Sequence, residues 1–279
     1  MEDILTALAS RLKQKDNSAN KGTNGTLTVA AGSELYRGAA ALASSAALRC
    51  GVGIVRLVSV EKVISSAAAR LPECVFLPTE SENGAMSYRD FARKMPAFSK
   101  SRAVLAGCGM TDCTDTGNII AELIKYGGYQ LIIDADGLNS IKNRPELLKS
   151  AALPPVITPH IGEMARLTGA SADAIKSDRE KTAAEFSRKY NCITVLKDCK
   201  TVISSPEGKL FVCDRPNAGL AKGGSGDVLS GIISSFAAQG YDAFDAAVCG
   251  TALHSLAAES AREKLTEYSM LPSDIVAEI

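Results

Sequence analysis

The sequence has no excess of either charge, and this limits the partners that it can attract. Its 279 residues include 31 Lys and Arg against 31 Asp and Glu, so the formal net charge is zero, and no cluster of like charge stands out. A protein that binds nucleic acid through the phosphate backbone needs a basic surface. We therefore expect no nucleic-acid partner.

Paired cysteines and grouped histidines are also missing. The eight cysteines are scattered without a C-x-x-C pair, and neither of the two histidines lies at ligand spacing from them. Disulfide frameworks and structural zinc sites are recognised by such spacings. We expect reduced thiols and no structural zinc, in a cytoplasmic protein.

No segment indicates secretion or membrane insertion. The N-terminus opens with Glu2 and Asp3 and lacks a basic and apolar leader, and no apolar run of about 18 residues follows. With 46% hydrophobic residues, the chain can bury one large core. We expect an N-terminal arm over residues 1–20, with apolar positions 4, 5, 8 and 12 packed on the domain or on a neighbour, and a single domain over 21–279.

Short apolar runs alternate with longer helical patterns along the chain. This alternation predicts an α/β fold with a mostly parallel central sheet and helices on both faces. The predicted strands span 27–30, 54–58, 103–106, 131–133, 156–158 and 193–196, and the predicted helices span 39–49, 63–69, 117–126 and 179–190. Two further short strands, 201–204 and 210–213, flank a turn at 205–208 and predict an antiparallel hairpin. After Asp227 the pattern is helical to the end.

The most informative segment is the glycine-rich stretch 217–227, Asn-Ala-Gly-Leu-Ala-Lys-Gly-Gly-Ser-Gly-Asp, which leads into an apolar run. Its glycines allow positive φ and let the backbone amides approach a ligand closely. A helix that begins there presents free N–H groups and its positive dipole end, which suit a phosphate. Asp227 then lies beside an anion site, where its carboxylate can face a substrate hydroxyl that is about to be phosphorylated. The alternative is that Asp227 only caps the helix.

Other unusual residues follow the predicted strands, and in open parallel sheets ligands bind at the carboxyl ends of strands. The small residues around Ala39 suit either a bulky ligand or dense packing. Gly107 and Gly109 suit either a ligand or a tight turn. Asp134 and Asp136 can hold Mg²⁺ through water, touch a polar substrate group or cap the next helix.

Two later strand ends carry groups that suit a ligand. His160 follows a proline-fixed turn, and we expect it to contact a ligand, although a lone histidine is more often structural. Glu163 can cap the next helix or reach a metal-bound water. Lys197 and Thr201 can donate to phosphate or ribose oxygens, and the alternative for Lys197 is a solvated loop residue. We expect His254, inside a helical run, to be an ordinary packed or surface residue.

Seven short motifs occur along the chain in a fixed order. They are Lys-Gly-Thr-Asn-Gly at 21–25, Ala-Gly-Ser at 31–33, Gly-Cys-Gly at 107–109, Asp-Ala-Asp-Gly-Leu-Asn at 134–139, Thr-Pro-His-Ile-Gly-Glu at 158–163, Leu-Lys followed by Thr at 196–201, and the stretch 217–227. In this order they resemble the ADP- or ATP-dependent NAD(P)H-hydrate dehydratases, over nearly the whole chain. The resemblance implies a ribokinase-like three-layer fold.

The resemblance also implies a function and a set of site residues. The family repairs NADH or NADPH whose ring has added water, by dehydrating it at the expense of a nucleotide. By resemblance, Ala39, Gly109, His160 and Asp227 face the hydrated cofactor. The nucleotide is placed against Lys197, Asp198, Cys199, Lys200, Thr201, Asn217, Gly224, Ser225 and Gly226.

Asp227 is the predicted catalytic residue. It draws the proton from the ring hydroxyl, this oxygen attacks the terminal phosphoryl group, and the amides of 224–226 stabilise the transferred charge. The ring nitrogen then expels phosphate and restores NADH or NADPH, and ADP as the donor leaves AMP. Mg²⁺ is expected to bridge the phosphates, and the sequence assigns it no ligand.

Three positions depart from the family pattern, which usually has proline at Cys108 and Ile161 and glycine at Pro216. We expect these changes to alter loop stiffness and affinity more than the reaction. The resemblance also implies a homotetramer, and similarity to free-standing bacterial members favours ADP as the donor. Bacterial members often carry a fused epimerase domain, for which 279 residues leave no room, so an epimerase that acts upstream is expected to be a separate protein.

Two other functions suit the same residues. A small-molecule kinase of this fold, such as hydroxyethylthiazole kinase, shares the Gly-Ser-Gly-Asp turn and releases a phosphorylated alcohol. His160 and the pair Asp134 and Asp136 are more typical of the dehydratases. The other alternative is a nucleotide-binding regulator without catalysis, against which an intact Asp227 argues.

Overall fold

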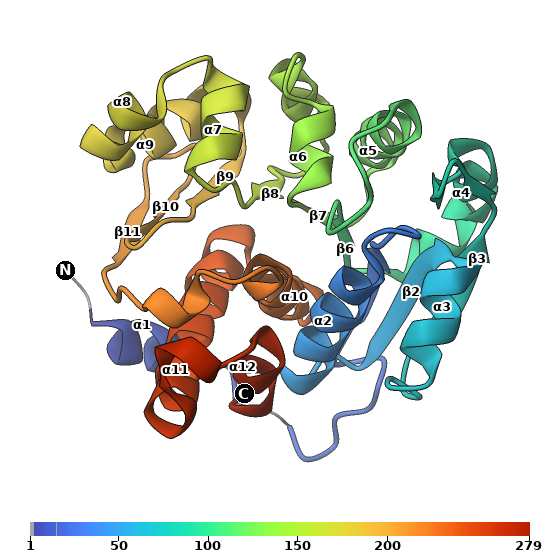
Figure 1. Cartoon of the computed structure of the whole chain (residues 1–279), viewed down its shortest axis with the longest axis horizontal. Coiled ribbons are helices and arrows are strands. Elements are labelled where there is room, and N and C mark those ends of the chain that lie inside the picture. Colours follow the sequence, from blue (N-terminus) through green and yellow to red (C-terminus); the bar gives the residue numbers. More distant parts are fainter. Residues whose placement is uncertain (1–2, 15) are drawn as a thin grey trace.

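A nine-stranded sheet forms the centre of the protein in this computed structural model, which describes residues 3–14 and 16–279 (Figure 1). Its strands are β1 (Thr26–Ala30), β2 (Ile54–Val60), β3 (Val75–Thr79), β6 (Ala103–Ala106), β7 (Gln130–Ile133), β8 (Val156–Ile157), β9 (Ile193–Leu196), β10 (Thr201–Ser204) and β11 (Leu210–Cys213). Their order is β11-β10-β9-β8-β7-β6-β1-β2-β3. Neighbouring strands from β9 to β3 pair in parallel, whereas β10 pairs antiparallel with both β9 and β11.

Helices cover both faces of this sheet (Figure 1). One layer contains α1 (Ile4–Arg11), α2 (Arg37–Arg49), α3 (Glu61–Ala68), α10 (Ser225–Ala238), α11 (Ala243–Ser269) and α12 (Pro272–Ala277). The other contains α4 (Tyr88–Lys94), α5 (Thr114–Tyr126), α6 (Asp136–Ser140), α7 (Ile161–Thr168), α8 (Ala172–Ser177) and α9 (Arg179–Tyr190). Short elements complete the fold, namely the 3-10 turns η1 (Met95–Lys100), η2 (Pro145–Ser150) and η3 (Ala218–Leu220) and the strand pair β4 (Ser81–Glu82) and β5 (Ala85–Met86). The predicted three-layer α/β architecture is confirmed.

The predicted strands and the antiparallel hairpin are present, with small shifts at some ends. Thr201 of β10 pairs with Cys213 of β11, as the hairpin requires. Strand β3 was missing from the prediction, and it contains Pro78. Proline lacks the N–H that a central strand needs, and β3 lies at the edge of the sheet, where one side of the strand has no partner strand.

Helix α1 packs against α11 through a narrow apolar face. Ile4 and Leu8 are buried there, and Arg11 Nε lies 3.0 Å from Asp245 Oδ1 of α11. Leu5 points its side chain to the exterior. Residues 1, 2 and 15 of the predicted arm lie outside the described residues. Within the described ranges, none of the helices is both long and apolar enough to span a bilayer.

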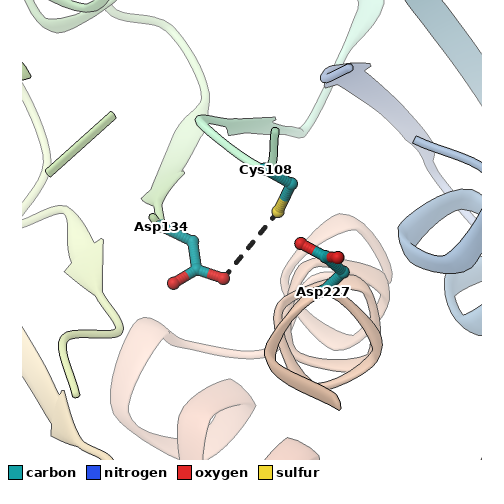
Figure 2. Close-up of side chains that lie close together, drawn as sticks. All are labelled: Cys108, Asp134 and Asp227. Atoms are coloured by element: carbon teal, nitrogen blue, oxygen red, sulfur yellow. Dashed lines mark hydrogen bonds between the residues drawn. The ribbon is translucent and has the colours of Figure 1, made fainter. Parts of the chain in front are cut away.

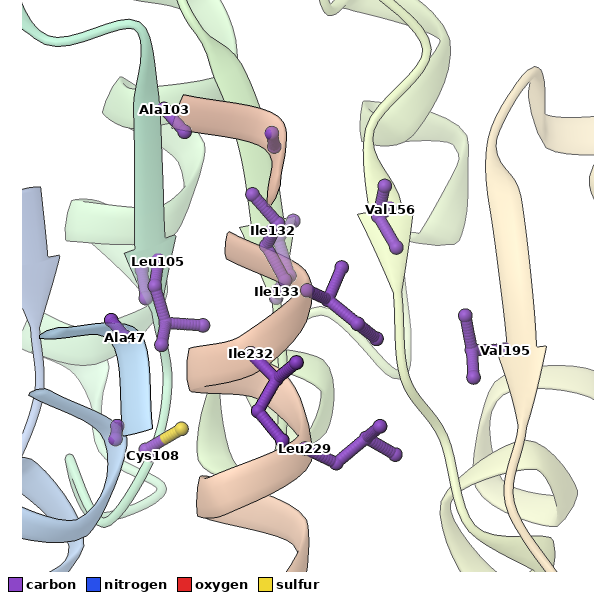
Figure 3. Packing of buried hydrophobic residues seen from close by; sticks show 14 of the residues in the cluster. Ala47, Ala103, Leu105, Cys108, Ile132, Ile133, Val156, Val195, Leu229 and Ile232 are labelled. Atoms are coloured by element: carbon purple, nitrogen blue, oxygen red, sulfur yellow. The ribbon is translucent and has the colours of Figure 1, made fainter. Parts of the chain in front are cut away.

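Helix α10 is buried on almost every side and packs closely against α2. A Cβ atom on Gly231 would lie 2.3 Å from the carbonyl oxygen of Ala43 in α2, so the two backbones touch. The small residues of α2 therefore serve dense helix packing, which was one of the two explanations considered for them. On the other side, Leu229 and Ile232 lie in the same buried cluster as Ile133 of β7 (Figure 3). This packing holds the first turn of α10 at the carboxyl ends of the parallel strands.

Candidate functional site

A cavity of about 990 Å³ lies at the carboxyl ends of β7, β8 and β9, where the sequence predicted it. Its size is that of a site for a nucleotide-sized ligand. The first turn of α10 forms one wall, and the loop after β9 forms another. Ten of the residues predicted for the site line it, namely His160, Lys197, Asp198, Cys199, Thr201, Asn217, Gly224, Ser225, Gly226 and Asp227.

The start of α10 is open toward this cavity. Its N-cap residue is Gly224, which has no side chain to occupy the free amides and adopts a φ of 104°. A Cβ atom there would lie 2.6 Å from Leu42 Cδ1, so the position requires glycine both for its dihedral angle and for space. Asp227 lies in the first turn, three residues after the cap. The alternative in which Asp227 serves as the helix cap is therefore wrong.

Asp227 is partly buried, and burial is the main reason that its pKa rises to about 6. Repulsion from the carboxylate of Asp134 acts in the same direction, whereas Cys108 and Lys197 lower the pKa. A carboxylate with this pKa is ionised at neutral pH and still accepts a proton more readily than an ordinary aspartate. Its properties suit a general base.

Asp134 and Lys197 form an ion pair beneath the start of α10. Lys197 Nζ lies 2.8 Å from Asp134 Oδ1, and Ser230 Oγ donates to Asp134 Oδ2 at 2.7 Å. Burial alone would raise the pKa of Asp134, but Lys197 and Ser230 outweigh burial and hold it below its usual value. A Cβ atom on Gly226 would lie 3.3 Å from Lys197 Nζ, so the ammonium group lies directly beside the helix start. Lys197 is thus a paired, nearly buried cation, and the alternative of a solvated loop residue is wrong.

Cys108 completes a compact cluster with the two carboxylates (Figure 2). Its Sγ donates to Asp134 Oδ2 at 3.8 Å, and one ligand atom from each of Cys108, Asp134 and Asp227 lies within 4.8 Å of the others. Burial raises the pKa of the Cys108 thiol well above its usual value, and both carboxylates add to this rise. The group therefore stays protonated and acts as a hydrogen-bond donor.

His160 and Glu163 are engaged with the start of α7. His160 Nδ1 accepts a hydrogen bond from the Gly162 N–H at 2.9 Å, and Glu163 Oε2 accepts one from the His160 N–H at 2.9 Å. This reciprocal arrangement is a capping box. Burial is the first cause that lowers the pKa of His160, followed by the charge of Lys197, so the imidazole is neutral at pH 7. Both side chains also line the cavity, so His160 combines the structural role with a position beside a ligand.

The loop after β9 turns only some of its side chains toward the cavity. Cys199 and Thr201 line it, whereas Lys200 Nζ is paired with Asp214 at 2.7 Å and is not part of the lining. Asp198 lines the cavity while its Oδ2 accepts a hydrogen bond from Arg179 Nε at 2.9 Å.

Asn217 also lines the cavity, and both ends of its side-chain amide form hydrogen bonds. Its Oδ1 accepts from the Gly219 N–H at 3.0 Å and its Nδ2 donates to the Ala258 carbonyl at 3.1 Å.

Ala39 and Gly109 lie together outside the lining of this cavity. A Cβ atom on Gly109 would be 2.9 Å from the Ala39 Cβ and 2.7 Å from the Tyr36 Cβ, so the loop after β6 packs directly on the start of α2. Gly109 follows Cys108 and thereby borders the acidic cluster. Ala39 and Gly109 are thus connected to Asp227 through Cys108. Neither of the two residues is part of the cavity lining.

The two carboxylates after β7 diverge. Asp134 lines the cavity, whereas Asp136 Oδ2 accepts a hydrogen bond from the Thr111 N–H at 2.8 Å. Ala135 between them has a φ of 48°, which is strained for a residue other than glycine. This conformation sends the two side chains to different places, so they do not form a joint metal site.

Sequence reasoning missed a polar group on α11. His254 is packed, as expected, but it also lines the cavity together with Thr251 one turn earlier. The spacing of residues 251 and 254 shows that they share one face of a helix. The sequence does not show that this face borders the cavity, because that depends on the position of α11 beside the glycine-rich turn.

Comparison with known proteins agrees with this geometry. A family model described as NAD(P)H-hydrate dehydratase matches residues 27–279. An ADP-dependent (S)-NAD(P)H-hydrate dehydratase of Xanthomonas campestris is 30% identical, over 99% of this chain and 95% of that protein. A bifunctional NAD(P)H-hydrate repair enzyme of Moorella thermoacetica is 32% identical over 98% of this chain. The chain spans about half the length of the bifunctional relatives, 52% in the case of Moorella.

Solved structures support the fold. A crystal structure of an ADP/ATP-dependent NAD(P)H-hydrate dehydratase from Bacillus subtilis, co-crystallised with ATP and Mg²⁺, superposes with a TM-score of 0.84 at 26% identity and covers 99% of this chain and 94% of that one. A ribokinase-like superfamily protein of Enterococcus faecalis shares the fold, with a TM-score of 0.84. The ribokinase-like fold is thereby confirmed. A hydroxyethylthiazole kinase of Pyrococcus horikoshii, at 13% identity and a TM-score of 0.60, shares the fold alone.

Proposed function

The chain belongs to the NAD(P)H-hydrate dehydratase family, and from this membership we propose that it uses a nucleotide, with ADP as the preferred donor, to convert hydrated NADH or NADPH back to NADH or NADPH. The observation that carries the proposal is the position of Asp227. This carboxylate has a pKa of about 6 and lies in the first turn of a glycine-capped helix that opens on a nucleotide-sized cavity.

The first chemical step is phosphorylation of the ring hydroxyl. Asp227 accepts the hydroxyl proton while the oxygen forms a bond to the terminal phosphorus of the nucleotide, and the bond from that phosphorus to the bridging oxygen breaks. With ADP the leaving group is AMP. The amides around Gly226 face the transferred group, and Lys197 adds a positive charge next to them.

The second step is elimination of phosphate. The lone pair of the ring nitrogen expels the phosphate from the neighbouring carbon, and the next ring carbon then gives a proton to water, so that the dihydronicotinamide ring is restored. Phosphorylation is needed because hydroxide is a poor leaving group. In this scheme Ala39, Gly109 and His160 contact the hydrated cofactor, and the neutral imidazole of His160 offers Nε2 as a hydrogen-bond donor.

The donor atoms around Asp227 suit a Mg²⁺ ion that is carried by the nucleotide. Mg²⁺ prefers oxygen ligands, keeps several waters and is held by one or two carboxylates together with phosphates. Both oxygens of Asp134 already accept hydrogen bonds, and the thiol of Cys108 is a soft donor. Glu163 is likewise engaged with His160, so we propose that Asp227, which lines the cavity, holds the ion through water. When bound, the ion neutralises charge on the phosphates.

The test is an assay of purified protein with NADH hydrate in the presence of ADP, ATP or no nucleotide. Absorbance of reduced nicotinamide should appear only with a nucleotide, and chromatography should show AMP and phosphate when ADP is the donor. A kinase of this fold would consume nucleotide and accumulate a phosphorylated product without NADH. A regulator would bind nucleotide and consume none.

We also propose a homotetramer that works in the cytoplasm downstream of an epimerase. The exposed side chains of Leu5 on α1 and of Leu12 directly after α1 are candidate subunit contacts. Light scattering on the purified protein tests the tetramer, and a monomeric mass would contradict it. If the protein acts on one epimer only, conversion of an epimeric mixture should stop before completion and should finish when an epimerase is added.

A further inference from the structure

The cavity wall contains three buried polar atoms that have no hydrogen-bond partner among the described residues. They are Ser225 Oγ at the start of α10 and Thr251 Oγ1 and His254 Nε2 on α11. The three residues are 6%, 3% and 7% exposed, and all of them line the cavity. Buried polar atoms normally have partners, because an unmade hydrogen bond costs folding free energy. Three such atoms on one wall indicate that a ligand supplies the partners.

The environment of His254 fixes which group it offers. Burial lowers its pKa to about 4, so the imidazole is neutral at pH 7. A hydrogen bond with the Ser225 backbone acts against this effect and raises the pKa, which means that the ring donates in that bond. Since Nε2 has no partner in the described part of the chain, the donating atom is Nδ1. A neutral ring that carries its proton on Nδ1 presents a lone pair at Nε2.

We propose that His254 is a specificity-determining residue whose Nε2 accepts a hydrogen bond from a neutral N–H or O–H donor of the nucleoside part of the phosphoryl donor. This inference rests on the proposed function, and it adds a chemical criterion for the nucleotide. An adenine nucleoside offers such donors at its exocyclic amino group and at its ribose hydroxyls.

The position and the polarity of His254 both exclude a phosphate as its partner. A phosphate oxygen is an acceptor, and two lone pairs facing each other repel. The ring is one hydrogen bond away from Ser225, so it lies just behind the amides that face the phosphates. Apolar side chains such as Leu220 and Leu229 line the same cavity and suit the nonpolar face of a nucleoside.

Two substitutions separate the roles of the two ring nitrogens. His254→Asn keeps a polar atom near Nδ1 for the Ser225 backbone and removes the acceptor at Nε2, whereas His254→Gln restores an acceptor near Nε2. Ser44→Ala is the matched control, because Ser44 also has a buried hydroxyl without a partner but does not line the cavity. Thermal melting of each variant checks that it is folded.

The experiment is calorimetric binding of ADP, of IDP, which lacks the amino group, and of 2′-deoxy-ADP and 3′-deoxy-ADP. Wild type should bind one of the three analogues about 5- to 30-fold more weakly than ADP, and the analogue identifies the donor. His254→Asn should weaken ADP by the same factor and lose that preference, and His254→Gln should recover most of both. Ser44→Ala should match wild type.

The inference is overturned if His254→Asn binds ADP as wild type does, with the same order of analogues. Should His254→Asn fail to fold, the wild type decides, because equal affinity for ADP and all three analogues contradicts the proposal. Turnover of NADH hydrate with ADP is measured in parallel. If the wild type turns over but shows no preference, only this inference fails, whereas a wild type that binds ADP and forms no NADH contradicts the proposed function.

Discussion

Two helices begin at the edge of the same cavity, and their first turns are built in opposite ways. At the start of α7, the side chains of His160 and Glu163 occupy the backbone donors in a capping box. At the start of α10, the cap is Gly224, and no side chain covers the amides. Where side chains already accept hydrogen bonds from the first backbone N–H groups, as in α7, those groups are not free for a ligand. Where the N–H groups have no such acceptor, as in α10, they can bind an anion. We therefore expect the phosphates to bind at the start of α10, whereas α7 positions neighbouring groups.

The strongest test of this assignment is Asp227→Asn, which leaves the open helix start intact and removes the base. We expect kcat for NADH hydrate to fall by about 10² to 10⁴, because this is the contribution of a well-placed general base. The Kd for ADP should change little. Stopped-flow absorbance and calorimetry measure the two quantities, and a variant that retains wild-type turnover would remove Asp227 from the mechanism.

Lys197→Met tests the charge beneath the open helix start. The substitution leaves Asp134 buried and unpaired, and breaking such a pair costs about 3–5 kcal/mol of unfolding free energy. The double variant Lys197→Met with Asp134→Asn removes both charges and should recover much of this loss. Urea denaturation measures the free energies. Equal stability of the single and double variants would show that the unpaired charge of Asp134 does not destabilise the fold.

Gly224→Ala tests why the N-cap residue of α10 is a glycine. The added Cβ meets Leu42 at 2.6 Å, and the positive φ is unfavourable for alanine, so we expect a loss of about 1–3 kcal/mol together with weaker ADP binding. Gly223→Ala is the matched control for stability, because a Cβ there has no neighbour within 4 Å. If both variants unfold at the same denaturant concentration, the special conformation of Gly224 has no energetic role.

The residues in these predictions also show which features of the fold and of the site could be predicted from the sequence. The glycines before Asp227 identify an open helix start, because this pattern is local in the sequence. The alternation of strands and helices is also visible in the sequence, and it predicts the parallel sheet. The sequence could not tell that Asp134 is held by Lys197, since those residues meet only through the pairing of β7, β8 and β9. Likewise, the separation of Asp134 from Asp136 depends on the strained backbone of Ala135, and the position of His254 depends on the packing of α11 against α10.

The pH dependence distinguishes a base from a merely structural carboxylate at the open start. The rate kcat/KM should rise with pH through the pKa of Asp227, about 6, and then level off, because only the ionised form accepts a proton. The contribution of Asp227 to the free energy of unfolding should change with pH in the opposite direction, that is, it should fall as the pH rises. A carboxyl whose folded pKa is raised above 3.8 contributes stability below that pH and loses it as the pH rises through about 6. Asp227→Asn should therefore melt at a higher temperature than wild type at pH 8, and the difference should shrink toward pH 4.

The smallest expected effect concerns the closed helix start, and it separates the two roles of His160. His160→Asn keeps a good N-cap side chain, whereas His160→Ala removes the cap and should cost about 0.5–2 kcal/mol of unfolding free energy. Both variants lack the imidazole. If His160 contacts the hydrated cofactor, both should raise KM for that substrate to the same extent despite their different stabilities. The contrary result is a KM close to wild type for His160→Asn and a raised KM only for the less stable His160→Ala. It would mean that His160 serves as the cap of α7 and that its imidazole does not contact the substrate.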